Sequence, residues 1–263
     1  MSLPTTSLAG KHALVCGASS GLGRATALAF AAAGARLTVL ARSAEKLEAL
    51  AEEALAAGAP EAHAQPADLE ERDLLAEALD EVLDAGPVHV LVNNAGGPPG
   101  GPLLEATDED FEQTFRRHVL AAHYLAQRCV PGMREAGYGR ILNIISTSVR
   151  EPIPGLGVSN TIRGAVASWA KTLSKELPPG ITVNNLLPGF TDTDRLTQLK
   201  AGNAARQGVE EEDVERAWLA SVPEGRLGRP EELAALAAFL ASPAGAFVRG
   251  QSIAVDGGRL NGI

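Results

Sequence analysis

Short apolar segments alternate with longer helical patterns along the whole 263-residue chain. The apolar segments have the length and the β-branched content of buried strands. They span residues 13–16, 37–40, 88–92, 140–145, 181–187 and 253–255. Amphipathic helical patterns occupy residues 22–33, 70–84, 108–130, 157–177 and 230–241. Repeated strand–helix–strand units with short connections predict a parallel sheet covered by helices on both faces.

The domain organisation follows from the continuity of this pattern. No linker, composition break or internal repeat divides the chain, so we expect one doubly wound, Rossmann-type α/β domain over residues 1–263. The least regular stretch, residues 190–229, is polar and lies between the last two strands. Long connections in compact domains often cover a site, so this stretch is expected to be a lid or a long surface excursion.

Composition excludes several classes of function. The net charge is -9 and no basic run occurs, which argues against a nucleic-acid partner. Cys16 and Cys129 are too few for a disulfide framework, and no cluster has metal-ligand spacing, so no metal is expected. Residues 1–15 lack a signal pattern, and no run of 18 apolar residues occurs. We therefore expect a cytoplasmic protein without a membrane segment.

A glycine-rich loop follows the first predicted strand and precedes a helix. Its spacing is G-x-x-x-G-x-G, and glycines there let the backbone turn tightly and approach a diphosphate. The helix N-terminus then offers free N–H groups and the positive end of its dipole. A glycine turn without a ligand is the alternative. The candidate cofactor contacts in this loop are Gly17, Ser19, Ser20, Gly21, Leu22 and Gly23.

The residue after the second strand bears on which dinucleotide binds. An acidic side chain at this point would accept hydrogen bonds from a ribose 2′-hydroxyl and favour NAD. The chain has Arg42 there instead, and a guanidinium can pair with a 2′-phosphate. We therefore expect NADP(H) to be preferred over NAD(H), unless Arg42 is only a solvated surface charge.

Several further segments resemble known motifs. They are Asp68-Leu69, Asn93-Asn94-Ala95-Gly96, residues 188–193 (PGFTDT), residues 228–232 (GRPEE) and residues 255–258 (VDGG). With the glycine loop, these segments resemble the short-chain dehydrogenase/reductase family over residues 8–260. The resemblance implies about seven parallel strands, a homodimer or homotetramer, and hydride transfer between NAD(P)(H) and a small-molecule carbonyl or alcohol. It also implies further cofactor contacts at Asp68, Leu69, Asn94, Ala95, Gly96, Pro188, Gly189, Thr191 and Thr193.

The resemblance breaks down at the catalytic positions. Family enzymes use an asparagine, a serine, a tyrosine and a lysine. The matching positions here are His118, Ser146, Ser159 and Arg163. Only Ser146 keeps the family residue, so the chain is expected to belong to an atypical subgroup that lacks the catalytic tyrosine and lysine. Arg163 would still hold the nicotinamide ribose.

These replacements change the proton chemistry. A serine hydroxyl is a much weaker acid than a phenol, and an arginine does not release a proton at neutral pH. His118 is of the right type for a general acid, but it also lies on an apolar stripe with Phe111, Phe115, Ala122 and Leu125, so a core role is equally open. The only tyrosines, Tyr124 and Tyr138, do not fall at the phenol position.

Three functions remain open from the sequence. The first is an NADP(H)-dependent oxidoreductase in which Ser146 binds the substrate oxygen and His118 or a bound water supplies the proton. The second is a catalytically inactive NADP(H)-binding homologue, acting as a sensor or as an oligomer subunit. The third, a scaffold that no longer binds a nucleotide, would leave the glycine loop and the Asn94-Ala95-Gly96 segment without a role.

Overall fold

A seven-stranded parallel sheet forms the centre of the protein, as expected. The computed structural model describes residues 4–98 and 100–262. The strand order is β3-β2-β1-β4-β5-β6-β7. The strands are β1 (His12–Cys16), β2 (Arg36–Ala41), β3 (Ala62–Pro66), β4 (Val90–Asn93), β5 (Gly139–Ile144), β6 (Ile181–Pro188) and β7 (Ser252–Val255). The order reverses between β1 and β4, which places a topological switch point beside the first strand.

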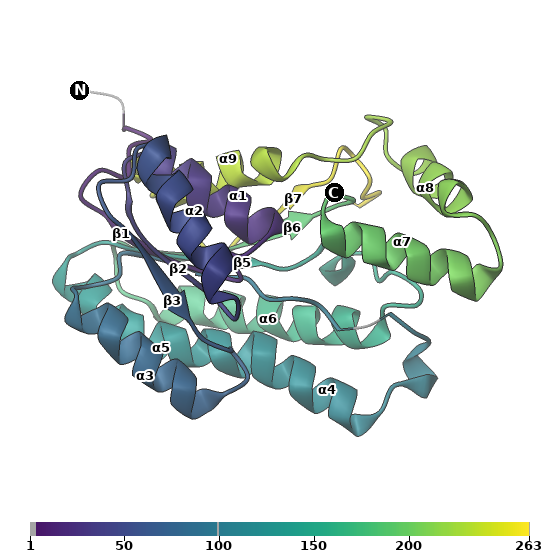
Figure 1. Ribbon diagram of the computed structural model, residues 1–263, viewed down its shortest axis with the longest axis horizontal. Helices are drawn as coiled ribbons and strands as arrows, with labels where there is room; N and C mark the ends of the chain where they lie inside the picture. Colours follow the sequence, from purple (N-terminus) through teal and green to yellow (C-terminus); the bar gives the residue numbers. More distant parts are fainter. Residues whose placement is uncertain (1–3, 99, 263) are drawn as a thin grey trace.

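Helices cover both faces of the sheet. They are α1 (Gly21–Ala32), α2 (Ala44–Ala57), α3 (Arg72–Asp84), α4 (Asp108–Phe115), α5 (Ala121–Glu135), α6 (Gly157–Glu176), α7 (Asp194–Gln207), α8 (Glu211–Ala220) and α9 (Pro230–Ala241). Helices α1, α2 and α9 lie on one face, and α3 to α6 lie on the other (Figure 1). Among the described residues, no helix combines the length and the apolar character that a bilayer span requires.

Side chains from the two faces of the sheet pack into two separate apolar cores. Side chains alternate along β1: Ala13 and Val15 pack into the core under α1 and α9, whereas Leu14 and Cys16 pack into the core under α3 and α5. This alternation follows from the period of two in a strand. Because both faces are covered, the strands other than β3 read as mainly apolar runs in the sequence, which is why they could be found there.

A row of polar side chains crosses four neighbouring strands, β4, β5, β6 and β7. Asn93 Nδ2 donates to Asn143 Oδ1 at 2.8 Å, and Asn143 Nδ2 donates to Asn185 Oδ1 at 2.8 Å. Asn185 Nδ2 then donates to Ser252 Oγ at 3.0 Å. These residues are also backbone neighbours in the ladder. A one-residue slip would leave buried amides unpaired, so the row fixes the register at the edge where the site lies.

The helical pattern at residues 108–130 is divided in the structure. Helix α4 ends at Phe115, a π-helical turn spans Arg116–Leu120, and α5 continues to Glu135, past Pro131. The π turn changes the helical register. The predicted apolar stripe is therefore interrupted: Phe115 is exposed, whereas Ala122 and Leu125 are buried. Single π turns are rare and often mark functional sites.

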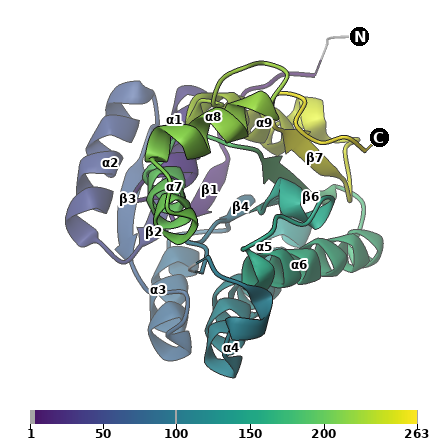
Figure 2. The same ribbon diagram turned by 90° about the vertical axis from the view of Figure 1, so that its right-hand side faces the viewer.

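The stretch predicted to be least regular contains two helices. Thr193 caps α7, its Oγ1 accepting from the Leu196 backbone N–H, and Gly208 ends the helix with a φ of +65°. Helix α8 follows almost at once. Its weak apolar pattern reflects its position outside the sheet, because only Val214 of this helix is buried. Figures 1 and 2 show α7 and α8 at one end of the molecule, beyond the layers that sandwich the sheet.

Candidate functional site

The glycine loop and the segment after β4 are in direct contact at the switch point. Asn94 Nδ2 donates to the Gly17 carbonyl oxygen at 3.1 Å. A Cβ at Gly17, whose φ is +59°, would lie 2.5 Å from the Asn94 carbonyl oxygen, and a Cβ at Gly23 would overlap the Gly17 carbonyl oxygen. Both positions therefore need glycine for a close backbone approach as well as for conformation.

The N-terminus of α1 has the properties of an anion site. Ser20, at the N-cap, makes no side-chain capping bond, and the first turn has no acidic residue. Gly21 has a φ of +53°, which turns the chain into the helix. Ser19 and Leu22 are half-buried and Ser20 is exposed at the rim of the loop. Uncapped N–H groups at the positive end of a helix dipole fit the diphosphate of a dinucleotide.

The segment after β6 packs against this loop. Thr193 Cγ2 lies 3.3 Å from the point where a Cβ of Gly21 would be. The Gly189 backbone N–H donates to the Val255 carbonyl oxygen at 3.0 Å, and a Cβ at Gly189 would lie 2.7 Å from the Asp256 Cα. Pro188 ends β6, and Thr191 is buried two residues before Thr193. The structure thus brings Thr193 to the glycine loop, whereas the contacts of Gly189 are with β7 and Asp256.

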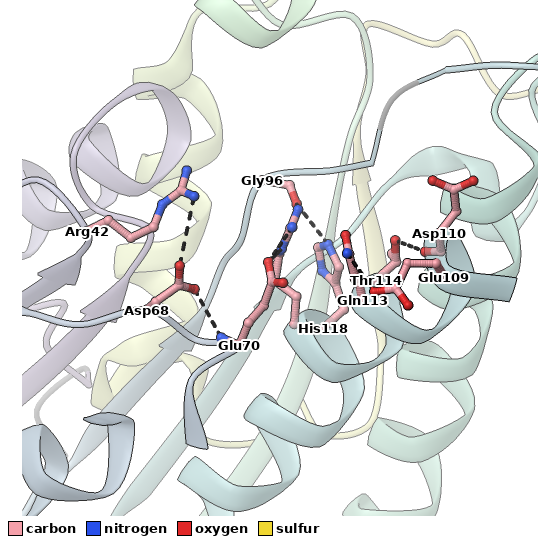
Figure 3. A network of polar contacts seen from close by, with 10 residues as sticks. Arg42, Asp68, Glu70, Gly96, Glu109, Asp110, Gln113, Thr114 and His118 are labelled. Carbon is pink, nitrogen blue, oxygen red and sulfur yellow. Dashed lines mark hydrogen bonds and ion pairs between the residues drawn. The ribbon is translucent and has the colours of Figure 1, made fainter. Parts of the chain in front are cut away.

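Arg42 and Asp68 lie opposite each other at the carboxyl ends of β2 and β3 (Figure 3). An Arg42 Nη1 atom is 3.9 Å from Asp68 Oδ2, and the Arg42 side chain is 77% exposed. Such a long, solvated ion pair contributes little and leaves the guanidinium free to pair with an added phosphate. Leu69 and Ala95 line a small cavity beneath the same edge of the sheet.

His118 is held in the neutral form by its surroundings. It is buried on the π turn, and its Nε2 donates to the Gly96 carbonyl oxygen at 3.1 Å (Figure 3). Burial and the nearby Arg163 charge lower the pKa of His118 to about 3. A ring that is unprotonated at pH 7 and donates its N–H to the backbone is a poor proton donor for a substrate. These contacts instead make His118 a support for the loop at Gly96.

Ser159 and Arg163 meet on one face of α6, as their i, i+4 spacing predicts. Arg163 Nε donates to Ser159 Oγ at 3.1 Å, and its Nη1 donates to the Ile145 carbonyl oxygen at 2.8 Å. Burial and the neighbouring Arg195 charge lower the pKa of Arg163 to about 10, so the side chain remains a cation at pH 7. Ser146 follows Ile145 directly, and its Oγ accepts from the Ser148 backbone N–H at 3.0 Å.

Two arginines that the sequence did not single out join this cluster. Arg195, in the first turn of α7, donates to the Pro98 carbonyl oxygen. A Cβ at Gly97 would lie 3.4 Å from Nη2 of both Arg163 and Arg195. Arg117 donates to the Gly96 carbonyl oxygen and is ion-paired with Glu70. Arg195 sits in the segment without a clear sequence pattern, so no motif could have identified it.

The hydroxyl groups of both tyrosines form hydrogen bonds outside the cluster of Ser146, Ser159 and Arg163. The Tyr138 hydroxyl donates to the Ala241 carbonyl oxygen, and the ring packs beneath Lys11 and Arg140. The Tyr124 hydroxyl accepts from Arg128 Nη1 at 3.0 Å on α5. Neither phenol makes contact with Ser159 or Ser146 in these interactions, and no described group of three or more His, Cys, Asp or Glu side chains could hold a metal ion.

Comparison with known proteins decides the family. The family described as enoyl-(acyl carrier protein) reductase matches residues 17–259. The chain belongs to the short-chain dehydrogenase/reductase family. It is 36% identical to an uncharacterized oxidoreductase of Mycobacterium tuberculosis, over 94% of this chain and 91% of the relative. It is 32% identical to the NADPH-dependent reductase BacG of Bacillus subtilis, over 96% of this chain and 99% of the relative.

A solved structure agrees with this assignment. L-sorbose reductase from Gluconobacter frateurii, complexed with NADPH and L-sorbose, matches with a TM-score of 0.91 at 29% identity. The match covers 98% of this chain and 99% of that chain. The chain is thus a member of an oxidoreductase family with a Rossmann fold, and the predicted family resemblance is confirmed. The assignment of His118, Ser159 and Arg163 to an atypical subgroup stays a prediction.

The burial of His118 predicts a pH dependence of stability. Its pKa falls from 6.5 to about 3 on folding, so its contribution is present above pH 6.5 and is lost as the pH falls toward 3. We expect the free energy of unfolding to drop by roughly 2 kcal/mol more between pH 7 and pH 5 in the natural protein than in His118→Asn. Denaturant titrations at the two pH values measure this.

The exposed His63 provides the matched control for this measurement. A His63→Asn variant should keep the pH dependence of the natural protein. Burial and Arg36 lower the pKa of His12 to about 4, so His12 also makes stability fall in this pH range. Its effect is the same in the natural protein and in His118→Asn, and it cancels when the two are compared. An equal loss of stability in the natural protein and in His118→Asn would contradict a buried, neutral His118.

Proposed function

We propose that this protein is an NADP(H)-dependent oxidoreductase that transfers hydride to or from a small carbonyl or alcohol substrate with a non-standard proton donor. The observation that carries the proposal is the juxtaposition of two features at one edge of the sheet. One is the uncapped N-terminus of α1 beside Gly17 and Asn94. The other is the cluster of Ser146, Ser159 and Arg163 at the end of β5.

The residues at the switch point fit a dinucleotide. Glycine backbone and free N–H groups at α1 would hold its diphosphate, and Arg42 would pair with a 2′-phosphate. When bound, the reduced nicotinamide supplies the hydride. The names of BacG and of the L-sorbose reductase complex, both of which specify NADPH, support NADP(H) as the cofactor. The remaining contacts would come from Asp68, Leu69, Asn94, Ala95, Gly96 and residues 188–193.

Substrate binding and stabilisation of the developing charge would fall to three side chains, Ser146, Ser159 and Arg163. Ser146 Oγ would hold the substrate oxygen by a hydrogen bond. Arg163 donates to Ser159 Oγ, which leaves the Ser159 hydroxyl proton free to point toward that oxygen. The buried guanidinium charge would stabilise negative charge developing on the oxygen in the transition state, where a low-dielectric setting strengthens the effect.

The proton itself is proposed to come from a bound water molecule that Ser159 positions. His118 is neutral, and Arg163, with a pKa of about 10, holds its protons at pH 7. A serine is shorter than a tyrosine, so a water molecule can bridge the Ser159 hydroxyl and the substrate oxygen. The substrates favoured by such a weak acid are those that need little protonation, such as quinones and imines, rather than simple ketones.

Two accessory features belong to the same proposal. The segment 190–229 acts as a lid, since α7 places Thr193 against the glycine loop and Arg195 beside Arg163. The chain is also expected to assemble as a homodimer or homotetramer. The cytoplasmic location stays a prediction.

Arg42 gives a direct test of cofactor preference. We expect Arg42→Ala to raise the dissociation constant for NADPH roughly 10-fold to 100-fold, because one charge-assisted contact to a phosphate is lost. The dissociation constant for NADH should change little, since NADH lacks that phosphate. Calorimetric titration with both cofactors measures the two constants. Tighter binding of NADH than of NADPH by the natural protein would contradict the preference.

Turnover tests the oxidoreductase itself. We expect the natural protein to oxidise NADPH with members of a carbonyl and quinone panel, and Ser146→Ala to lower kcat/KM about 100-fold through loss of the hydrogen bond to the substrate oxygen. Absorbance at the reduced nicotinamide band follows the reaction. Ser168→Ala, at an exposed position of α6, is the matched control. NADPH binding without turnover above background would instead favour the inactive homologue.

A further inference from the structure

A cavity adjoins Ser146. It has a volume of about 120 Å³ and lies between the end of β5, the end of β6 and the lid helices α7 and α8. Its walls are mostly apolar, with Ile153, Leu196 and Leu199 among the lining residues, and Ser146 reaches it from the β5 side. A substrate whose oxygen bonds to Ser146 would place its body in this cavity.

One cation, Arg259, enters this apolar space. Its guanidinium carbon lies 4.8 Å from the centroid of the Phe190 ring. Phe190 in turn stacks on Trp218 of α8, with centroids 4.9 Å apart and an interplanar angle of 14°. Arg259, Phe190 and Trp218 thus lie next to one another in the wall of the cavity. A guanidinium held over an aromatic ring keeps its N–H donors available for hydrogen bonds.

Not all N–H donors of the Arg259 guanidinium have an acceptor. Arg259 Nη1 donates to Thr147 Oγ1 at 3.3 Å, but Arg259 Nε is shielded from solvent and has no hydrogen-bond partner among the described residues. Within residues 4–98 and 100–262, no carboxylate forms an ion pair with it. Asp256, three residues away, accepts from the backbone of Gly258 and Leu260 instead. Arg259 thus brings to the cavity wall a charge that no described carboxylate neutralises, and such a charge is costly in an apolar setting unless a ligand pairs with it.

The geometry points to a carboxylate as that acceptor. A carboxylate matches the planar fork of a guanidinium with two parallel hydrogen bonds. The cavity is comparable in size to the engineered cavity of roughly 150 Å³ that binds benzene, so a ligand body of about one six-membered ring matches it. Because Thr147 follows Ser146, the carboxylate and the reacting carbonyl would be held close together.

The inferred substrate class is therefore a small oxo acid or hydroxy acid with an apolar or aromatic body. This inference rests on the proposed function, since it assigns the reacting oxygen to Ser146. Arg259 would be a specificity-determining residue: it binds the carboxylate, while Phe190 and Trp218 pack against the body. Neutral ketones of the same size would lose the ion pair and leave the guanidinium edge unpaired.

Trp218 allows binding to be followed without catalysis. The chain has two tryptophans, so Trp169→Phe leaves Trp218 as the sole indole fluorophore. The NADP⁺-saturated Trp169→Phe protein is titrated with benzoate and with benzamide, which share a ring but differ in charge. We expect a saturable change in Trp218 fluorescence with benzoate and at least 10-fold weaker binding of benzamide. Equal affinities for the acid and the amide would overturn the inference.

Arg259→Gln in the same background tests the residue. Benzoate binding should weaken at least 10-fold, whereas benzamide binding should change little. Arg216→Gln is the matched control, because Arg216 lies on the same helix as Trp218 but is exposed and paired with Asp213. Unchanged benzoate binding in Arg259→Gln would contradict the inference. If Arg259→Gln does not fold, the benzoate and benzamide comparison in the parent protein decides on its own.

Turnover separates this inference from the proposed function. NADPH oxidation is measured with phenylpyruvate and with its methyl ester. A higher kcat/KM for the acid than for the ester, lowered at least 10-fold by Arg259→Gln, supports both the carboxylate site and the proposed function. Equal turnover of acid and ester, unaffected by Arg259→Gln, overturns the carboxylate assignment and leaves the oxidoreductase standing. Selective benzoate binding without any turnover supports the carboxylate site and overturns the proposed function.

Discussion

The close approach of Gly17, Gly23 and Asn94 is the constraint on which the site depends. It joins the loop after β1 to the loop after β4 across the switch point, and a Cβ at either glycine would force the backbones apart. With the loops so close, the uncapped end of α1 faces the crevice and the segment Asn94–Gly96 runs along its floor. The asparagine row across β4, β5 and β6 holds the same edge in register, so Ser146 emerges beside the cofactor loop.

Around this edge the protein gathers positive charge without an equal number of carboxylates. Arg163 and Arg195 lie together near Gly97, and Arg259 lines the cavity beyond Ser146. Burial and, to a smaller extent, the neighbouring Arg195 charge lower the pKa of Arg163, so the repulsion between these cations adds to the cost of burying one of them. An anionic ligand relieves this repulsion, and the dinucleotide and a carboxylate substrate would each do so. The cofactor side and the substrate side of the crevice therefore both attract anions, although the two sides are built from different segments of the chain.

The sequence predicted most of the fold and the cofactor loop, because buried parallel strands and glycine spacing leave strong local patterns. Strand β3, Ala62–Pro66, left no such pattern because it is a half-buried edge strand of mixed polarity. The helix at 108–130 was expected to be continuous, and the π turn at Arg116–Leu120 has no sequence signature. Arg195 and the grouping of Arg259, Phe190 and Trp218 could not be foreseen, since their contacts join residues far apart in the chain.

The central claim is that a Rossmann crevice without a catalytic phenol still directs hydride to a substrate carbon. Deuterium transfer measures this most directly. The protein is incubated with phenylpyruvate and NADPH deuterated at one or the other C4 position, and the alcohol product is analysed by mass spectrometry. We expect deuterium on the carbinol carbon from only one of the two labelled cofactors, because the crevice presents one face of the ring. An absence of deuterated product from both cofactors, with the protein folded and NADPH bound, would contradict the account.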